Sequence, residues 1–307
     1  MKLGIPRALL YYRYQILWDT FFKELGIETI LSPKTDKKIM DQGAFYSIDE
    51  ACLSSKLYLG HVDALIGKCD AIFIPRIATF KHDGVLCTRF EGLYDIVCNT
   101  FREKNVRFIS LNVDEQQKIS EEKGYINLGL ELGYTKREAK EAYQKAKAAD
   151  LRSQKEHEAS QEAALNTTDA VKILVVAHPY NLYDEYIGVP VVSKLKELGA
   201  VPIFTDHLQQ EKARAHYTDI CKDVPWIMSR ELVGSIAYYH DKIDGLILMT
   251  AFPCGPDSML NEMIIRRIKD LPILNLLQDS QDGNAGVDTR LESFVDIIRF
   301  RKGDFVS

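Results

Sequence analysis

The sequence lacks any run of about eighteen apolar residues, the length that a membrane-spanning helix needs. Its first residues, MKLGIPRALL, show no apolar stretch followed by a cleavage site of small residues, so no secretory signal is predicted. A basic excess is also missing, because 39 Lys and Arg stand against 44 Asp and Glu, for a formal charge of −5. A phosphate-binding surface usually needs such an excess. We therefore expect a cytoplasmic protein with no membrane and no nucleic-acid partner.

Motifs of several common enzyme classes are missing as well. No G-x-G-x-x-G follows a predicted strand, and neither G-x-S-x-G nor H-E-x-x-H occurs. The segment that ends in Gly67-Lys68-Cys69 has the wrong spacing for a P-loop, and Cys69 stands where Ser or Thr would bind magnesium. None of the six cysteines forms a C-x-x-C pair, which argues against thioredoxin-like and zinc-ribbon sites. Disulfides are not expected in a cytoplasmic chain.

The sequence does have the size and pattern of a two-domain α/β protein. Its 307 residues exceed what one typical core supports, and 46% of them are hydrophobic. Short apolar runs alternate with amphipathic stretches, which predicts βαβ units and parallel sheets. We expect an N-terminal Rossmann-like lobe at 1–134, a helical linker at 135–169 and a C-terminal Rossmann-like lobe at 170–307.

The pattern also predicts individual elements. In the first half, strands are predicted at 2–5, 28–31, 71–74 and 107–110, and helices at 8–25, 49–65 and 92–103. In the second half, strands are predicted at 171–177, 201–204, 245–249 and 273–277, and helices at 184–198, 257–268 and 288–299. Ser47 and Glu50 form a capping box that predicts the start of the helix at 49–65. Thr135 and Glu138 form another at the start of the linker helix.

Polar residues follow several of the predicted strands. Ligands of parallel sheets bind beyond the carboxyl ends of the strands, and two lobes with such edges predict a ligand in an interlobe cleft. The residues concerned are Pro6-Arg7, Pro75-Arg76, His178-Pro179-Tyr180-Asn181, Phe252-Pro253-Cys254-Gly255-Pro256-Asp257 and Gln278-Asp279.

Three cysteines lie next to elements of positive potential. Cys254 comes just before a predicted helix that we expect Asp257 to cap, and the unpaired amides at a helix N-terminus favour a thiolate. Cys52 lies in the first turns of its own predicted helix. Cys87 lies in a loop with Arg89 close by. Three such thiolates would suit an anionic iron–sulfur cluster, although free cysteines also serve simply as small buried residues.

The other cysteines and two histidines have simpler interpretations. Cys69 precedes a buried strand, Cys98 lies inside an amphipathic helix and Cys221 lies in a charged segment, so packing is the expectation for all three. His61, inside a helix, is expected to be a core histidine whose hydrogen bonds are made. For His178, at a strand end, a core position and a role in orienting a ligand or a cluster sulfur both stay open.

The motifs, taken in order, resemble the DUF2229 family. They are Gly4-Ile5-Pro6-Arg7-Ala8-Leu9, Tyr11-Tyr12, Trp18, Asp49-Glu50-Ala51-Cys52, Lys56, Gly60-His61-Val62, Ile74-Pro75-Arg76, Cys87, Gly92-Leu93, His178-Pro179-Tyr180-Asn181, Asp184, Cys254-Gly255-Pro256-Asp257-Ser258 and Thr289-Arg290-Leu291-Glu292. This family of acyl-CoA dehydratase activase-related proteins is related to 2-hydroxyacyl-CoA dehydratase subunits and double-cubane cluster proteins. The resemblance covers nearly the whole chain.

The resemblance implies two Rossmann-like lobes with a [4Fe–4S] cluster in the interlobe cleft, held by Cys52, Cys87 and Cys254. One iron would lack a protein thiolate. In the dehydratase relatives that iron is central to radical dehydration, and electrons come from an ATP-hydrolysing activator protein. The substrate would be a CoA thioester or another small molecule. Arg7, Arg76 and His178 are candidates for donors around the cluster.

Other interpretations stay open at this point. The chain is shorter than the dehydratase subunits and lacks the ATPase region of many relatives, so the resemblance does not decide whether it is an enzyme by itself. A double-cubane [8Fe–9S] cluster would need six thiolates, from one chain or from a homodimer, which is the commonest oligomer. A metal-free two-lobed module that binds a small ligand is the alternative of another class. A structural zinc site fits less well, because no clear fourth ligand is present.

Overall fold

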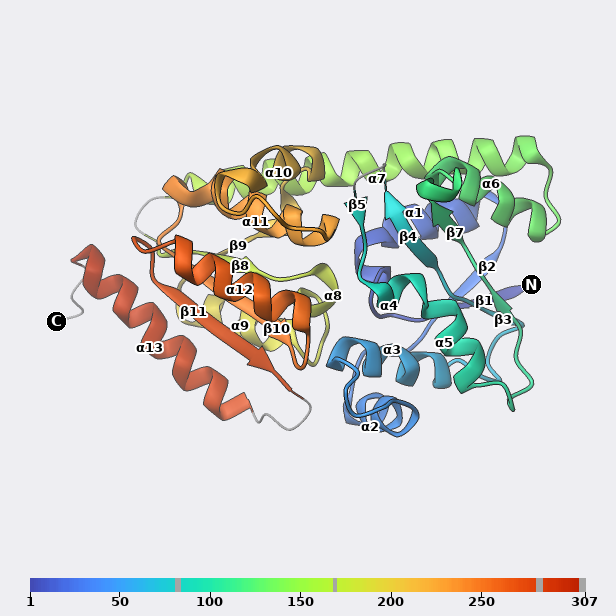
Figure 1. Cartoon of the computed structure of the whole chain (residues 1–307), viewed down its shortest axis with the longest axis horizontal. Coiled ribbons are helices and arrows are strands. Elements are labelled where there is room, and N and C mark those ends of the chain that lie inside the picture. The colour runs from blue at the N-terminus through green and yellow to red at the C-terminus, as the bar shows by residue number, and fades with distance from the viewer. Residues whose placement is uncertain (81–83, 168–169, 280–283, 304–307) are drawn as a thin grey trace. The chain divides into compact units, whose positions relative to one another are not determined.

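The computed structural model describes residues 1–80, 84–167, 170–279 and 284–303. The chain forms two compact units (Figure 1). Unit 1 comprises Met1–Ser153 with Pro225–Ile227, and unit 2 comprises Gln154–Val224 with Met228–Ser307. Both are α/β units, as the sequence predicts. No helix among the described residues has the length and apolar character needed to cross a membrane.

The main sheet of unit 1 is parallel, with four strands in the order β2-β1-β3-β6. These strands are β1 (Lys2–Ile5), β2 (Glu28–Leu31), β3 (Ala71–Phe73) and β6 (Phe108–Ile109). The four strands predicted for this half are confirmed to within one residue at each end. The helices between them are α1 (Tyr11–Glu24), α2 (Lys37–Tyr46), α3 (Leu53–Asp63), α4 (Thr88–Glu91) and α5 (Leu93–Thr100).

Aromatic side chains of α1 pack against this sheet. Trp18 and Phe22 both contact Phe73 of β3 edge to face, at ring-centroid distances of 4.9 and 5.2 Å. Phe21 contacts Tyr125 in the same way at 4.9 Å. Such pairs contribute about 0.5–1.5 kcal/mol beyond the area that they bury. These contacts hold α1 and hence the chain that follows β1.

A second, smaller sheet in unit 1 is not predicted by the sequence. It has the strand order β5-β4-β7, with β4 (Arg76–Phe80), β5 (Gly84–Val85) and β7 (Asn112–Asp114). Pro75-Arg76 looks like a strand end in the sequence, yet the chain passes through Pro75 directly from β3 into β4. Trp226 joins this region through an isolated bridge to Val85. The segment η1 (Glu115–Gln117) and the helix α6 (Glu121–Glu131) complete the unit.

The predicted helix at 49–65 is wrong at its start. Helix α2, which the sequence analysis missed, is capped by Asp36, whose carboxylate accepts a hydrogen bond from the Ile39 amide at 2.8 Å. Ser47 therefore terminates α2 instead of opening the next helix, and α3 begins six residues later with Cys52 as its N-cap. A capping box is a local motif. It does not reveal that its first residue, Ser47, already ends the helix before it.

The sheet of unit 2 is parallel throughout, with the strand order β11-β10-β8-β9. The strands are β8 (Lys172–Val176), β9 (Val201–Phe204), β10 (Gly245–Ala251) and β11 (Ile273–Gln278). The four strands predicted for this half are confirmed. The remaining elements are α8 (Pro179–Leu182), α9 (Gly188–Glu197), η2 (Thr205–His207), α10 (Gln210–His216), η3 (Tyr217–Asp219), α11 (Ile227–Tyr239), η4 (His240–Lys242), α12 (Gly255–Arg267) and α13 (Asn284–Lys302).

Both faces of this sheet are covered. On one face, Leu246 and Leu248 of β10 belong to a core cluster with residues of α11 and α12, such as Ile236 and Ile264. On the other face, a side chain at Gly245 would meet Phe294 and Ile298 of α13. Parallel sheets are normally buried on both sides, and the near-continuous apolar run of β10 follows from that.

The units are joined by one long helix, α7 (Lys136–Leu165). Its capping box is confirmed: the Glu138 carboxylate accepts a hydrogen bond from the Thr135 amide at 2.8 Å, and Thr135 Oγ1 accepts one from the Glu138 amide at 3.2 Å. The boundary between the units falls inside this helix, between Ser153 and Gln154.

Candidate functional site

The three predicted cluster ligands share one local position. Cys52 is the N-cap of α3, Cys87 of α4 and Cys254 of α12. All three thiols are half-buried, and none makes a side-chain capping bond to its own helix. The free amides of a helix N-terminus create positive potential there, which suits an anionic group. The sequence predicted positive surroundings for all three cysteines, from helix signals at Cys52 and Cys254 and from Arg89 at Cys87. The structure adds that Cys87, predicted in a loop, is the N-cap of α4.

Cys52 is fixed by the start of α3. Its backbone carbonyl accepts hydrogen bonds from the amides of Ser55 and Lys56, at 2.9 and 3.0 Å. Its Sγ lies 3.2 Å from Ser55 Oγ. The hydroxyl is thus one polar neighbour of this sulfur.

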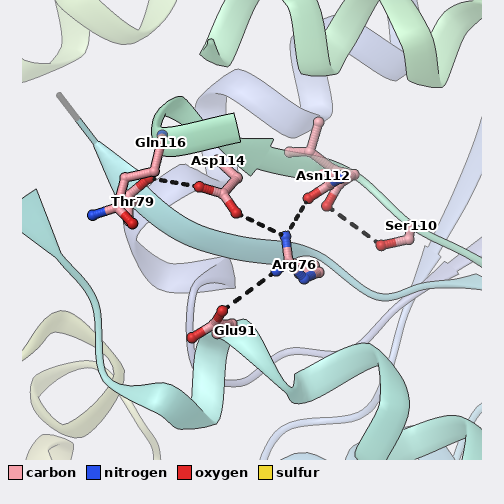
Figure 2. Close-up of polar contacts among 8 residues, drawn as sticks. Arg76, Thr79, Glu91, Ser110, Asn112, Asp114 and Gln116 are labelled. Carbon is pink, nitrogen blue, oxygen red and sulfur yellow. Dashed lines mark hydrogen bonds and ion pairs between the residues drawn. The ribbon is translucent and has the colours of Figure 1, made fainter. Parts of the chain in front are cut away.

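Arg76 lies at the centre of a network of polar contacts near the start of α4 (Figure 2). The Arg76 guanidinium donates to Asn112 Oδ1 at 2.6 Å and lies 3.6 Å from Asp114 Oδ2, both on β7. It also lies 3.5 Å from Glu91 Oε1, at the end of the short helix that Cys87 caps. Arg76 therefore ties β4, β7 and α4 together. The carboxylates of Glu91 and Asp114 both lie near this guanidinium, so Arg76 positions α4 relative to β7.

The motifs of Cys52 and Cys87 border one pocket of about 220 Å³. Ala51 and Ser55, on either side of Cys52 in the sequence, line it together with Arg89, two residues after Cys87. Two segments more than thirty residues apart in the chain thus meet at one surface within unit 1. Cys254 belongs to unit 2, so the complete set of three ligands stays a prediction.

Around Cys254, a buried hydrogen bond between Asp257 and His178 replaces the expected cap. Asp257 does not cap α12; its Oδ1 lies 3.0 Å from Nε2 of His178, which is the N-cap of α8. Both residues are about 95% buried, and the His178 ring stacks on Tyr180 at 5.0 Å. His178 Nδ1 is buried without a hydrogen-bond partner among the described residues. The pair fixes the first turn of α12 and leaves one polar atom of His178 for a further contact.

At the carboxyl edge of the unit 1 sheet, His61 is held by two hydroxyls. Its Nδ1 lies 2.8 Å from Ser32 Oγ and its Nε2 lies 3.0 Å from Thr35 Oγ1. Ser32 Oγ also accepts a hydrogen bond from the Arg7 amide at 2.8 Å. Burial, reinforced by the Arg7 charge, lowers the pKa of His61 to about 3. The expectation of a core histidine with its hydrogen bonds made is confirmed. Ser32, which the sequence analysis missed, could have been found because it directly follows β2.

The other three cysteines differ from the N-cap cysteines. Cys221 is 1% exposed and belongs to the core cluster of unit 2, which confirms its packing role. Cys69 Sγ donates to the Leu65 carbonyl at 3.4 Å. Burial raises the pKa of Cys69, Cys98 and Cys221, so the neutral thiol is favoured. Over the described ranges, no group of three or more His, Cys, Asp or Glu side chains that could hold a metal ion is found.

These observations define an α/β protein of two Rossmann-like units with cysteines at three helix N-caps. The chain belongs to the family described as the CoA enzyme activase uncharacterised domain (DUF2229), whose model matches residues 2–208. The predicted family is confirmed. No curated protein matches the chain.

Some solved structures are similar at low identity. They include the SBP FpvC from P. aeruginosa in complex with Ni²⁺, at 11% identity and a TM-score of 0.29, over 100% of this chain and 98% of that chain. The same SBP with Mn²⁺ gives 11% identity and a TM-score of 0.30, over 99% of each chain. ZnuA gives 12% identity and a TM-score of 0.26, over 97% and 98%. At these TM-scores the likeness carries no argument about the site.

Proposed function

We propose that this chain is an iron–sulfur protein in which Cys52, Cys87 and Cys254 hold a [4Fe–4S] cluster. The observation that supports the proposal most is that three half-buried thiols occupy helix N-caps. A helix N-terminus stabilises a thiolate and attracts an anionic group, and iron–sulfur clusters take thiolate ligands. The family description names a CoA enzyme activase, which supports a role beside a CoA-dependent enzyme. An ATP-hydrolysing activator as electron donor and a CoA thioester or another small molecule as substrate complete the proposal.

The residues present fit a [4Fe–4S] cluster in two ways: three cysteine thiols are available as ligands, and other side chains hold two of the helices that carry them. When bound, the cluster would supply one-electron chemistry at low potential and one iron without a protein thiolate. Arg76 holds α4 through Glu91 and so keeps Cys87 in place. Asp257 and His178 hold the first turn of α12, at which Cys254 stands. Rigid support of this kind keeps the ligating sulfurs oriented.

The double-cubane alternative has less support. It needs six thiolates, and the raised pKa values of Cys69, Cys98 and Cys221 favour the protonated, non-ligating form of each. Cys221 also lies inside an apolar core.

The test is anaerobic purification of the full chain from cells supplied with iron and sulfide. We expect about four iron and four labile sulfide per chain, and a paramagnetic resonance signal after dithionite reduction that changes with a CoA thioester if one is the substrate. Cys52→Ser, Cys87→Ser and Cys254→Ser should each lose most of the iron, whereas Cys69→Ser and Cys98→Ser should keep it.

Each other outcome has a defined meaning. Iron loss in a folded Cys69→Ser, Cys98→Ser, Cys221→Ala triple variant would favour the larger cluster. A folded, colourless protein without iron or labile sulfide would rule out the proposal and leave the metal-free binding module.

A further inference from the structure

The pocket in unit 1 has mostly apolar walls. They are formed by Ile48, Ala51, Leu59, Leu93 and Ile96, from α3, α5 and the segment that precedes α3. Its volume of about 220 Å³ is below that of typical sites for drug-sized ligands. This volume equals that of roughly seven waters in the liquid, at about 30 Å³ each. It therefore suits a ligand of about seven non-hydrogen atoms.

One charge stands in these apolar surroundings. Arg89 is the only charged residue among those that line the pocket, and it makes no hydrogen bond or ion pair with any residue in the described ranges. The neighbouring Arg76, in contrast, lies near the carboxylates of Glu91 and Asp114. A half-buried guanidinium without a carboxylate partner in the part of the chain that the structure describes presents a planar fork of donors, which matches a carboxylate in geometry and charge.

A second polar group in the pocket also has no partner. Ser47 lines it, and Ser47 Oγ is buried without a hydrogen-bond partner among the residues that the structure describes. Buried hydroxyls without a partner are uncommon in folded proteins. A ligand with an acceptor oxygen would supply the missing hydrogen bond.

We infer that this pocket binds a small aliphatic carboxylate of about six to eight non-hydrogen atoms. Its carboxylate pairs with Arg89, and its hydrocarbon body lies against Leu59, Leu93 and Ile96. A neutral acyl group would bury the same hydrocarbon but leave the guanidinium unpaired, so the free acid is preferred over its amide or thioester. The inference concerns the protein without its cluster and does not rest on the proposed function.

The pocket is linked to Cys52 through one hydroxyl. Ser55 lines the pocket, and its Oγ lies 3.2 Å from Cys52 Sγ. A bound carboxylate should therefore reduce access of reagents to this thiol. Cys69, a half-buried thiol of the same unit that does not line the pocket and donates to the Leu65 carbonyl, serves as an internal reference.

The test is calorimetric titration of the reduced, iron-free full chain with butyrate, 4-methylpentanoate and 4-methylpentanamide. We expect 4-methylpentanoate to bind, and the amide to bind at least about tenfold more weakly, since a hydrogen bond to a charged group contributes about 1.5–3 kcal/mol. Arg89→Gln should weaken the carboxylate to the level of the amide. Arg102→Gln, at an exposed position after α5, is the matched control and should leave binding unchanged. Ile96→Trp, which fills the pocket from a half-exposed site, should abolish binding.

A second readout is the rate of alkylation of Cys52 by iodoacetamide, followed by mass spectrometry. Saturating 4-methylpentanoate should slow it several-fold and leave the alkylation rate of Cys69 unchanged. Absence of binding, equal affinity for acid and amide, or unchanged affinity in Arg89→Gln would overturn the inference. A chain that takes up iron during anaerobic purification but binds no carboxylate once the iron is removed contradicts the pocket alone. A chain that takes up no iron but binds the carboxylate contradicts the cluster alone.

Discussion

His61 shows how one buried side chain can set the pH dependence of unit 1. Its pKa is about 3 in the fold, whereas that of an exposed histidine is about 6.5. Above pH 6.5 neither the folded nor the unfolded chain protonates it, so it causes no pH dependence there. As the pH falls from 6.5 towards 3, only the unfolded chain takes up the proton. We expect the unfolding free energy of unit 1 to fall by up to about 1.4 kcal/mol per pH unit on this account.

Urea unfolding at pH 7.5 and 5.0, followed by tryptophan fluorescence, measures this effect. Both tryptophans of the chain, Trp18 and Trp226, belong to unit 1, so the signal reports that unit. His61→Gln should be less stable at pH 7.5 and lose less stability on acidification. His240→Gln, in unit 2, should behave like the original protein. An acid-induced loss of full size in His61→Gln would contradict the assignment.

Arg76 provides a second prediction at the scale of one residue. Its guanidinium lies near the Asp114 carboxylate, which is 4% exposed and also accepts a hydrogen bond from Thr79 at 2.9 Å. Arg76→Leu leaves this buried charge without a cation, and we expect it to lower the unfolding free energy by about 3 kcal/mol. Adding Asp114→Asn should recover part of the loss, because the two sites interact. Strict additivity of the two changes in urea unfolding would show that the pair is not coupled.

At the scale of elements, α2 and α3 pack closely because of two glycines. A Cβ at Gly60 would overlap the carbonyl oxygen of Ile39, and one at Gly43 would overlap that of Lys56. Gly60→Ala must push the helices apart, and we expect a loss of about 1–3 kcal/mol in unfolding free energy. Gly92→Ala, where the nearest atom lies at 3.5 Å, is the matched control and should change stability little. Equal behaviour of both variants in urea unfolding would contradict the close packing.

The elements that the sequence predicts are those with a clear apolar period. All eight predicted strands exist, because a strand that is buried on both faces of a sheet has a continuous apolar sequence. The capping box at Thr135 also exists, because it depends only on residues close together in the chain. Helix α2 was missed although Ile39, Met40 and Gly43 form its buried face, because it has only ten residues and ends at the Ser47 that was interpreted as a cap. The small sheet was missed because Pro75 resembles the end of a strand. Local motifs could not reveal that Asp257 pairs with His178, because the two lie 79 residues apart.

The candidate site was also predictable only in part. Sequence motifs singled out Cys52, Cys87 and Cys254, and the structure places all three at N-caps. The pocket beside Cys52 could not be predicted, because its walls come from three elements whose packing depends on the fold. Ser47 was interpreted as a cap and turned out to be a pocket residue.

At the scale of the whole molecule, the region matched by the family does not coincide with a folding unit. It ends at residue 208, after β9, and therefore lacks β10, β11 and the helices α11 to α13. The core of unit 2 depends on those elements, as Leu246, Leu248 and Ile264 show. We expect a fragment of residues 1–208 to be protease-sensitive beyond α7, with β8 and β9 unprotected in hydrogen exchange. Protection of β8 equal to that in the full chain would contradict this expectation.

The return of Pro225–Ile227 to unit 1 has a consequence for biosynthesis. Trp226 bridges to Val85, and Ile227 lies where a side chain at Gly84 would stand. During translation, unit 1 is therefore complete only when Pro225–Ile227 has been synthesised, which happens after β8 and β9 of unit 2. Nascent chains arrested shortly before and shortly after this tripeptide emerges should differ in how completely the first unit has matured.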